Sequence, residues 1–107
     1  MKRREWTFLT NHGRVLAYLA KHPRATTREI SQEAGFTERA IQKVILDLVL
    51  DGYVVRKRVG RGNRYKVNPE LPMRHPMERE YAVGNLLLVL GCDPQKLGEQ
   101  QVADEIT

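Results

Sequence analysis

The chain has 107 residues, which suits one domain with a modest core and is too short for an enzyme core with a large substrate cleft. An ordinary apolar content of 41% excludes a chain that is disordered throughout. The formal net charge of +5 indicates a polyanionic partner.

A first helix is expected between Phe8 and His22, where apolar residues recur with the spacing of one helix face. Thr10 or Asn11 can cap its start. The sequence KHP ends it, because the residue before a proline avoids helical backbone angles. Trp6 and Phe8 are expected to pack in the core rather than to line a pocket.

A second, short helix is expected in the sequence TTREISQEA. Thr26 and Glu29 have the spacing of a capping box, in which each side chain accepts from the backbone N–H of the other residue. Ile30 is expected to face inward. Gly35 follows the helix and can adopt the positive φ that a tight turn between two helices requires.

A third helix is predicted over residues 37–51, in the sequence TERAIQKVILDLVLD, and Gly52 lies where a C′ glycine would end it. The helical period places one apolar face toward the core. That face consists of Ile41, Val44, Ile45 and Leu48. The opposite face near the N-terminus is polar, with Glu38, Arg39, Gln42 and Lys43.

A β-hairpin is predicted next, with strands over residues 53–59 and 63–67 around a turn at Gly60–Asn63. The segment Val54–Pro69 contains six Lys or Arg residues and no acidic residue. Its apolar and basic residues alternate in the manner of a strand with two different faces.

Beyond the hairpin, the proline-rich sequence PELPMRHP is expected to form an extended connector. It leads to a last helix predicted over residues 77–90, with Pro76 at its first position and Gly91 at its end. We therefore expect one domain over residues 1–91, followed by a polar, flexible tail over residues 92–107.

Helix, helix, glycine turn, helix and basic hairpin is the order of a winged helix-turn-helix, a mainly α fold with a small β-hairpin wing (α+β). The sequence REISQEAGFTERAIQKVILDLVLDGYVVRKRVGRGNRYKV resembles the DNA-reading half of the MarR- and ArsR-like prokaryotic regulators, and the resemblance covers roughly residues 6–90. It implies a sequence-specific transcriptional regulator of double-stranded DNA. The recognition helix 37–51 would enter the major groove, with the wing 53–67 at the adjacent minor groove.

The residue types on these two elements suit such an interface. Arg can pair bidentately with guanine, Gln can pair with adenine, and Glu can accept from N4 of cytosine. In the wing, basic side chains would contact phosphates, and an arginine between two glycines suits a narrow minor groove. The expected DNA-binding residues are Thr37, Glu38, Arg39, Gln42, Lys43, Arg56, Arg58, Arg61, Arg64 and Lys66. The alternatives are an ordinary solvated helix face and an edge hairpin that its charges protect from aggregation.

Two features predict a homodimer. Leu46 and Leu50 follow Arg39 and Lys43 on the outward side of the third helix, where a lone domain would leave them in water. The last helix is apolar nearly all round in its second half, which indicates burial on more than one side. The resemblance implies that such a C-terminal helix mediates dimerisation. The expected interface residues are Leu46, Leu50, Tyr81, Leu86, Leu87 and Leu90. Alternatively, this helix packs only on the first helix of the same chain.

No enzyme, metal or cofactor site is predicted. The single cysteine, Cys92, and the three histidines, His12, His22 and His75, are scattered along the chain, and no nucleophile is paired with a base. His12 and His75 lie in polar clusters and are expected to form caps or structural hydrogen bonds. One cysteine fits a reducing compartment, and no membrane segment or signal peptide is visible, so we expect a cytoplasmic protein.

Charge is divided unevenly along the chain. Residues 1–67 carry 15 Lys or Arg and six Asp or Glu, whereas residues 68–107 carry three and seven. A basic front and an acidic back suit a body that presents one face to an anion, although solubility alone would also account for them.

Two other functions are open at this point: a winged protein-interaction module whose basic face docks an acidic partner, and an RNA-binding winged domain. Arg39 and Gln42 favour DNA, because a docking surface needs no bidentate donors. With seven aromatic residues, most at core-like places, the chain offers little for stacking on RNA bases. A small-molecule effector between subunits is also left open.

Overall fold

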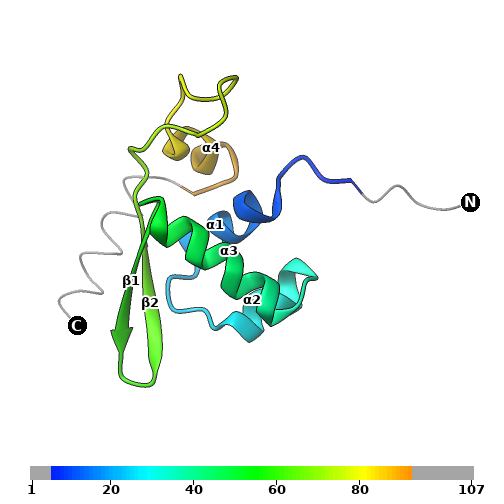
Figure 1. Cartoon of the computed structure of the whole chain (residues 1–107), viewed down its shortest axis with the longest axis vertical. Helices are drawn as coiled ribbons and strands as arrows, with labels where there is room; N and C mark the ends of the chain where they lie inside the picture. The colour runs from blue at the N-terminus through cyan, green and yellow to red at the C-terminus, as the bar shows by residue number, and fades with distance from the viewer. Residues whose placement is uncertain (1–5, 93–107) are drawn as a thin grey trace, which may run out of the picture.

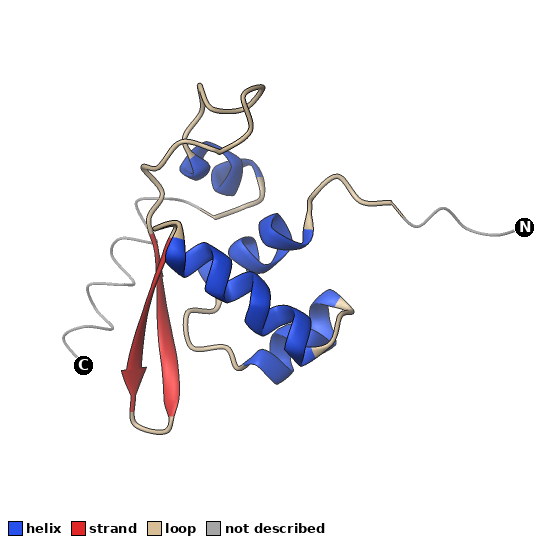
Figure 2. Ribbon diagram, viewed as in Figure 1, coloured by secondary structure: helices blue, strands red, loops and turns tan. Residues whose placement is uncertain are grey.

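The computed structural model describes residues 6–92 as four helices and one antiparallel hairpin. In chain order the elements are α1 (Asn11–Lys21), α2 (Thr27–Ala34), α3 (Glu38–Leu50), β1 (Val54–Val59), β2 (Gly62–Val67) and α4 (Val83–Val89). Figure 1 shows the hairpin projecting from the end of α3, with α4 far from the hairpin tip. Figure 2 shows that both described strands belong to this hairpin. The expected mainly helical fold with a hairpin wing is therefore confirmed.

Each of the first three helices begins at a threonine cap. A side-chain hydroxyl at the N-cap accepts from a backbone N–H that has no partner within the helix. The acceptors are Thr10, Thr26 and Thr37, and the donors are the backbone N–H groups of Gly13, Glu29 and Ala40, each 3.1 Å away. All three starts were predicted, and the structure selects Thr10 over Asn11 as the first cap.

The core forms where α1, α2 and α3 meet and the base of the hairpin closes over them. The predicted core face of α3 is confirmed, because its four apolar residues are buried. The main contributors from the four elements are Val15, Leu16, Leu19, Ala20, Ile30, Ile41, Val44, Ile45, Leu48, Val54, Tyr65 and Val67. Gly35 has a φ of +82° and Gly52 a φ of +85°, so both take the left-handed conformation that was expected at the helix ends.

The hairpin closes with a shorter loop than expected. Val59 pairs with Gly62, so the loop consists of Gly60 and Arg61, and the predicted turn through Asn63 is too long. Gly60 has a φ of +59°, which suits the first loop residue of a two-residue hairpin turn. At the hairpin base, the backbone N–H of Tyr65 donates to the carbonyl of Pro23 at 2.8 Å and ties β2 to the segment after α1.

The last helix is shorter than predicted. It spans Val83–Val89, and the expectation of a helix from Met77 onward is wrong for residues 77–82, which form turns and an isolated bridge between Pro72 and Ala82. The side chain of Asn85 accepts from the backbone N–H of Ala82 and caps the helix there. Residues 77–80 offer a single apolar side chain, so a helix through them would bury no face.

Two other expectations about the chain ends need correction. Cys92 was assigned to the tail, but it is 3% exposed and its Sγ lies 4.0 Å from the carbonyl of Ala17, so the packed body extends through it. Trp6 and Phe8 were expected in the core, yet they are 61% and 92% exposed and contact each other edge to face. They precede the Thr10 cap, outside the part of α1 that packs. The predicted tail beyond Cys92 lies outside the described residues.

We predict that Tyr53→Phe lowers the free energy of unfolding by about 0.5–1.5 kcal/mol, because the Tyr53 hydroxyl donates to the carbonyl of Pro72 and holds the connector on the body. Urea unfolding measures this, with Tyr81→Phe as the control, since Tyr81 is 58% exposed. Equal stabilities of the two variants would contradict it.

The same tyrosine should make stability sensitive to alkali. Burial raises the pKa of Tyr53 above its ordinary value, and the nearby Arg74 lowers that pKa in part. The folded chain therefore holds the proton more tightly than the unfolded chain. This contribution to stability is present below pH of about 10 and is lost as the pH rises further.

Candidate nucleic-acid interface

The first half of α3 presents a continuous polar face to solvent. This face lies opposite the buried Ile41 and Ile45. Its residues are Thr37, Glu38, Arg39, Gln42 and Lys43, all exposed. All except Glu38 carry hydrogen-bond donors that a helix in a major groove would present to base edges or phosphates. The structure therefore brings together all the site residues that the sequence placed on this helix.

The turn between α2 and α3 holds this face in place. The guanidinium of Arg14 donates to the carbonyl of Ala34 and lies 5.0 Å from the centre of the Phe36 ring. The hydroxyl of Ser31 donates to the carbonyl of Phe36. Together with the positive φ of Gly35, these contacts fix the angle at which α3 leaves the turn. Sequence reasoning missed Arg14, because its partner lies 20 residues away.

The register of the hairpin divides its side chains between two faces, since residues paired across antiparallel strands point to the same side. The inner wing face consists of Val54, Arg56, Arg58, Asn63, Tyr65 and Val67, and its base joins the core. The outer wing face consists of Val55, Lys57, Val59, Gly62, Arg64 and Lys66.

This division separates residues that the sequence treated as one group. Arg56 and Arg58 extend the inner wing face, whereas Arg64 and Lys66 lie on the outer one. Lys57 was missed, although the alternation along β1 would have placed it with them. Arg61 is exposed at the loop, as expected for a wing tip.

The wing is an unbalanced cluster of positive charge. No acidic residue occurs between Val54 and Val67, and Lys57 lies directly opposite Arg64. Like charges at paired positions destabilise a sheet, so an anion bound here would relieve the repulsion. Arg64 is half-buried, and its Nη1 is enclosed without a hydrogen-bond partner among the described residues. Its guanidinium is thus less accessible to a phosphate than those of Arg56 and Arg58, which are exposed.

The expected dimer residues fall into three groups. Leu46, Leu50 and Tyr81 are 45%, 73% and 58% exposed, whereas Leu86 and Leu90 are half-buried. Leu87 is 1% exposed and belongs to the core of its own chain, so its expected place in an interface is corrected. The outward residues of α4 are Leu88 and Val89. The pattern could not identify them, because this stretch is apolar on every side.

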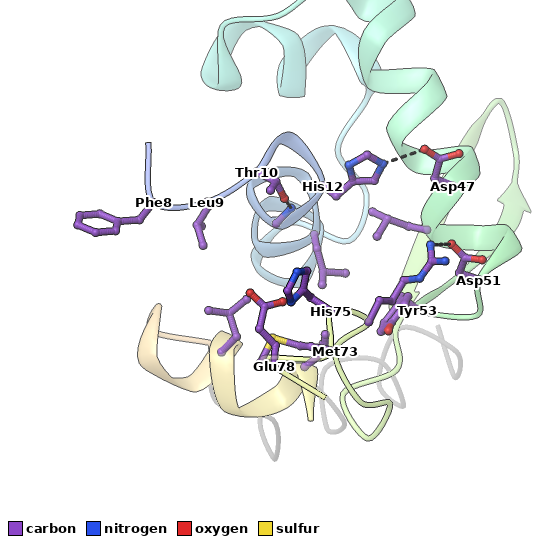
Figure 3. Close-up of a pocket in the computed structure, with 16 residues that line it drawn as sticks. Phe8, Leu9, Thr10, His12, Asp47, Asp51, Tyr53, Met73, His75 and Glu78 are labelled. Atoms are coloured by element: carbon purple, nitrogen blue, oxygen red, sulfur yellow. Dashed lines mark hydrogen bonds and ion pairs between the residues drawn. The ribbon is translucent and has the colours of Figure 1, made fainter. Parts of the chain in front are cut away.

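A pocket of about 530 Å³ lies where the start of α1, the end of α3, the connector and α4 meet (Figure 3). Leu16, Leu48 and Val83 contribute apolar lining. Its polar lining includes a hydrogen bond between His12 Nε2 and Asp47 Oδ2 at 2.8 Å and an ion pair between Arg74 and Asp51 at 2.7 Å. Phe8 also lines this pocket, and Figure 3 shows its ring directed away from the other labelled side chains.

The titratable groups around the pocket have structural contacts. Besides the His12 pair, Nδ1 of His75 accepts from the backbone N–H of Met77 at 3.1 Å, so the expected structural hydrogen bonding of both histidines is confirmed. Burial raises the pKa of the Cys92 thiol, which disfavours the reactive thiolate.

Within residues 6–92 no group of His, Cys, Asp or Glu side chains is arranged to hold a metal ion. In the same span no helix is long and apolar enough to cross a bilayer.

Comparison with protein-family models gives a match to the MarR family over residues 7–64. The matched span includes the whole of α1, α2, α3 and β1 and reaches into β2, so it covers more than half of the chain. It therefore contains the polar face of α3 and most of the wing. A comparison with curated proteins gives no match.

We predict that Arg14→Ala lowers the free energy of unfolding by about 1–2 kcal/mol, because it removes both the hydrogen bond to Ala34 and the contact with the Phe36 ring. Thermal or urea unfolding measures the change. Arg28→Ala is the matched control, since it removes an exposed arginine from α2. If the two variants were equally stable, Arg14 would not hold the turn.

Proposed function

Because the chain belongs to the MarR family of winged-helix DNA-binding transcriptional regulators, we propose that it reads the sequence of double-stranded DNA. The first half of α3 would enter the major groove, and the wing would lie at the adjacent minor groove. The observation that carries this proposal is the exposed polar face of α3 beside a wing without acidic residues. Regulators of this family are generally not enzymes. Because they bind chromosomal DNA, which in prokaryotes lies in the cytoplasm, we place this one in the cytoplasm.

The roles within the interface follow from side-chain chemistry. Arg39 and Gln42 would contact base edges, because both can donate or pair bidentately. Glu38 would accept from cytosine, while Lys43 and Thr37 would contact phosphates near the start of the helix. These assignments use side chains that the fold leaves in solvent.

The wing would contribute affinity more than sequence reading. A wing in a groove has a phosphate strand on each side, so both faces can contribute: Arg56 and Arg58 from the inner one, Arg64 and Lys66 from the outer one. Arg61 at the tip would favour a narrow, A·T-rich minor groove, where the negative potential is strongest.

Arg39→Ala should cost roughly 1–3 kcal/mol of binding free energy on the preferred site and relax the preference at one base pair. Its effect on scrambled duplexes should be much smaller. Arg56→Ala is the matched control: it should weaken binding to all sequences about equally and flatten the salt dependence by about one unit. The preferred site comes from selection out of random duplexes, and titrations at several salt concentrations measure both effects.

Two outcomes would contradict the proposal. If Arg39→Ala lowered affinity for both duplexes by the same factor, α3 would not be the reading helix. If selection enriched no motif at all, the winged module would be better explained as a docking surface for an acidic partner, which is the alternative function.

We also propose that the regulator is a homodimer. Exposed apolar side chains occur on the second half of α3 and on α4, at Leu46, Leu50, Leu88 and Val89. Together with Tyr81 and the half-buried Leu86 and Leu90, they form a larger apolar surface than a small monomeric protein usually exposes to water. Two-fold protein symmetry would favour operators with two-fold symmetry, with half-site centres about 10 bp apart or a multiple of it.

The double variant Leu46→Glu, Leu50→Glu should sediment as a monomer at micromolar concentration, because two buried carboxylates would oppose dimer formation. Val55→Glu is the matched control and should leave the dimer intact, since it places the same charge at a similarly exposed valine on the wing. A monomeric unmutated protein would refute the dimer, and a dimeric double variant would exclude α3 from its interface.

The pocket beside α1 and α4 suits a small-molecule effector. Its volume and mixed lining are those of ligand sites in general. The His12–Asp47 pair at its edge connects the start of α1 with α3. A ligand that displaced either partner would therefore act on the helix that we assign to DNA reading.

A further inference from the structure

The outer wing face is a sheet surface on which apolar and basic side chains alternate. Val55 and Val59 are 57% and 42% exposed, and Lys57 lies between them on the same strand and face. Arg64 and Lys66 complete this surface from β2. Exposed valines contribute nothing to a phosphate contact, so this face fits a partner that offers carboxylates and aliphatic side chains together.

We propose that residues 93–107 of the same chain dock on the outer wing face and compete there with nucleic acid. This segment has four acidic residues and one basic residue, whereas the wing has six basic residues and none that is acidic. Its acidic residues are Asp93, Glu99, Asp104 and Glu105, and its large aliphatic residues are Leu97, Val102 and Ile106. The segment thus offers the two kinds of side chain that the outer wing face would bind.

The chain enters this segment near the base of the wing. Cys92 is packed against Ala17 in the second half of α1, and Gly91 lies beside the side chain of Lys21 at the end of that helix. Two residues later, the carbonyl of Pro23 accepts from the backbone N–H of Tyr65 in β2. Fifteen residues span up to about 50 Å when extended, and a six-residue strand is only about 20 Å long. The segment is therefore long enough to reach every position of the wing.

Because the acidic segment is tethered to the chain that carries the wing, weak contacts are sufficient for docking. Individual exposed charge pairs contribute little, but a segment joined to the same chain is present at an effective concentration of about millimolar. Such a contact would be screened by salt and displaced by DNA, which has a higher density of negative charge. It would oppose phosphate contacts on the wing and leave the base contacts of α3 unaffected. This regulatory consequence, unlike the docking itself, rests on the proposed function.

Docking is tested without DNA, on the full chain, by the methyl NMR signals of Val55 and Val59. The triple variant Glu99→Gln, Asp104→Asn, Glu105→Gln should shift both signals. The control variant Glu70→Gln, Glu78→Gln, Glu80→Gln, which removes the same charge from exposed positions in the connector and in the turns after it, should not. Added salt should move the signals of the unmutated chain toward those of the triple variant. Signals that respond to neither the triple variant nor salt would overturn the proposal.

Competition is tested by titrating the same three proteins with a scrambled duplex at low salt. The triple variant should bind about threefold to tenfold more tightly than the unmutated chain, and the control variant less than twofold, because only the first releases the wing. If the triple variant and the control variant gained the same affinity for DNA, net charge alone would explain the gain. That outcome would overturn the proposed competition. If the methyl signals shifted while no protein bound DNA, the proposed function would fail and the docking would stand.

Discussion

The burial of one face of α3 is the constraint on which the rest of the interface depends. Ile41 and Ile45 are almost fully enclosed by α1, α2 and the hairpin base, and burying each such side chain contributes about 1.5–3 kcal/mol. A helix held on one side can present only the opposite side to a ligand. The exposure of Arg39 and Gln42 is therefore a consequence of core packing. The contacts of Arg14 at the preceding turn fix the direction in which α3 runs.

Features set by neighbouring residues could be predicted from the sequence, whereas features set by distant contacts could not. The three threonine caps and the core face of α3 were correct, because caps and helical periodicity involve residues three or four positions apart. The start of α4 was wrong, because a bridge between Pro72 and Ala82 decides it. Leu87 could not be distinguished from Leu88, since a helix that is apolar all round does not show which side faces the core.

The hairpin illustrates the same limit within the candidate site. Its strands and its charge were visible in the sequence, but the assignment of side chains to faces depends on the register, which the loop length sets. With Gly60 and Arg61 alone in the loop, Arg56 and Arg58 share a face with Tyr65, while Lys57 lies with Arg64. The wing is thus two surfaces: one continues from the core, and the other combines exposed valines with positive charge.

The opposite charges of the two parts of the chain address a difficulty that any strongly basic DNA reader faces. Positive charge attracts every phosphate backbone equally, so it raises affinity for the excess of wrong sites as much as for the right one. The base contacts that we propose for α3 would act only where the base edges match. An acidic segment that occupied part of the wing would weaken the phosphate contacts of the wing. It would leave the base contacts of α3 unchanged. The net acidity of residues 93–107 would then increase discrimination while it lowered overall affinity, and the wing would be the place where the two effects meet.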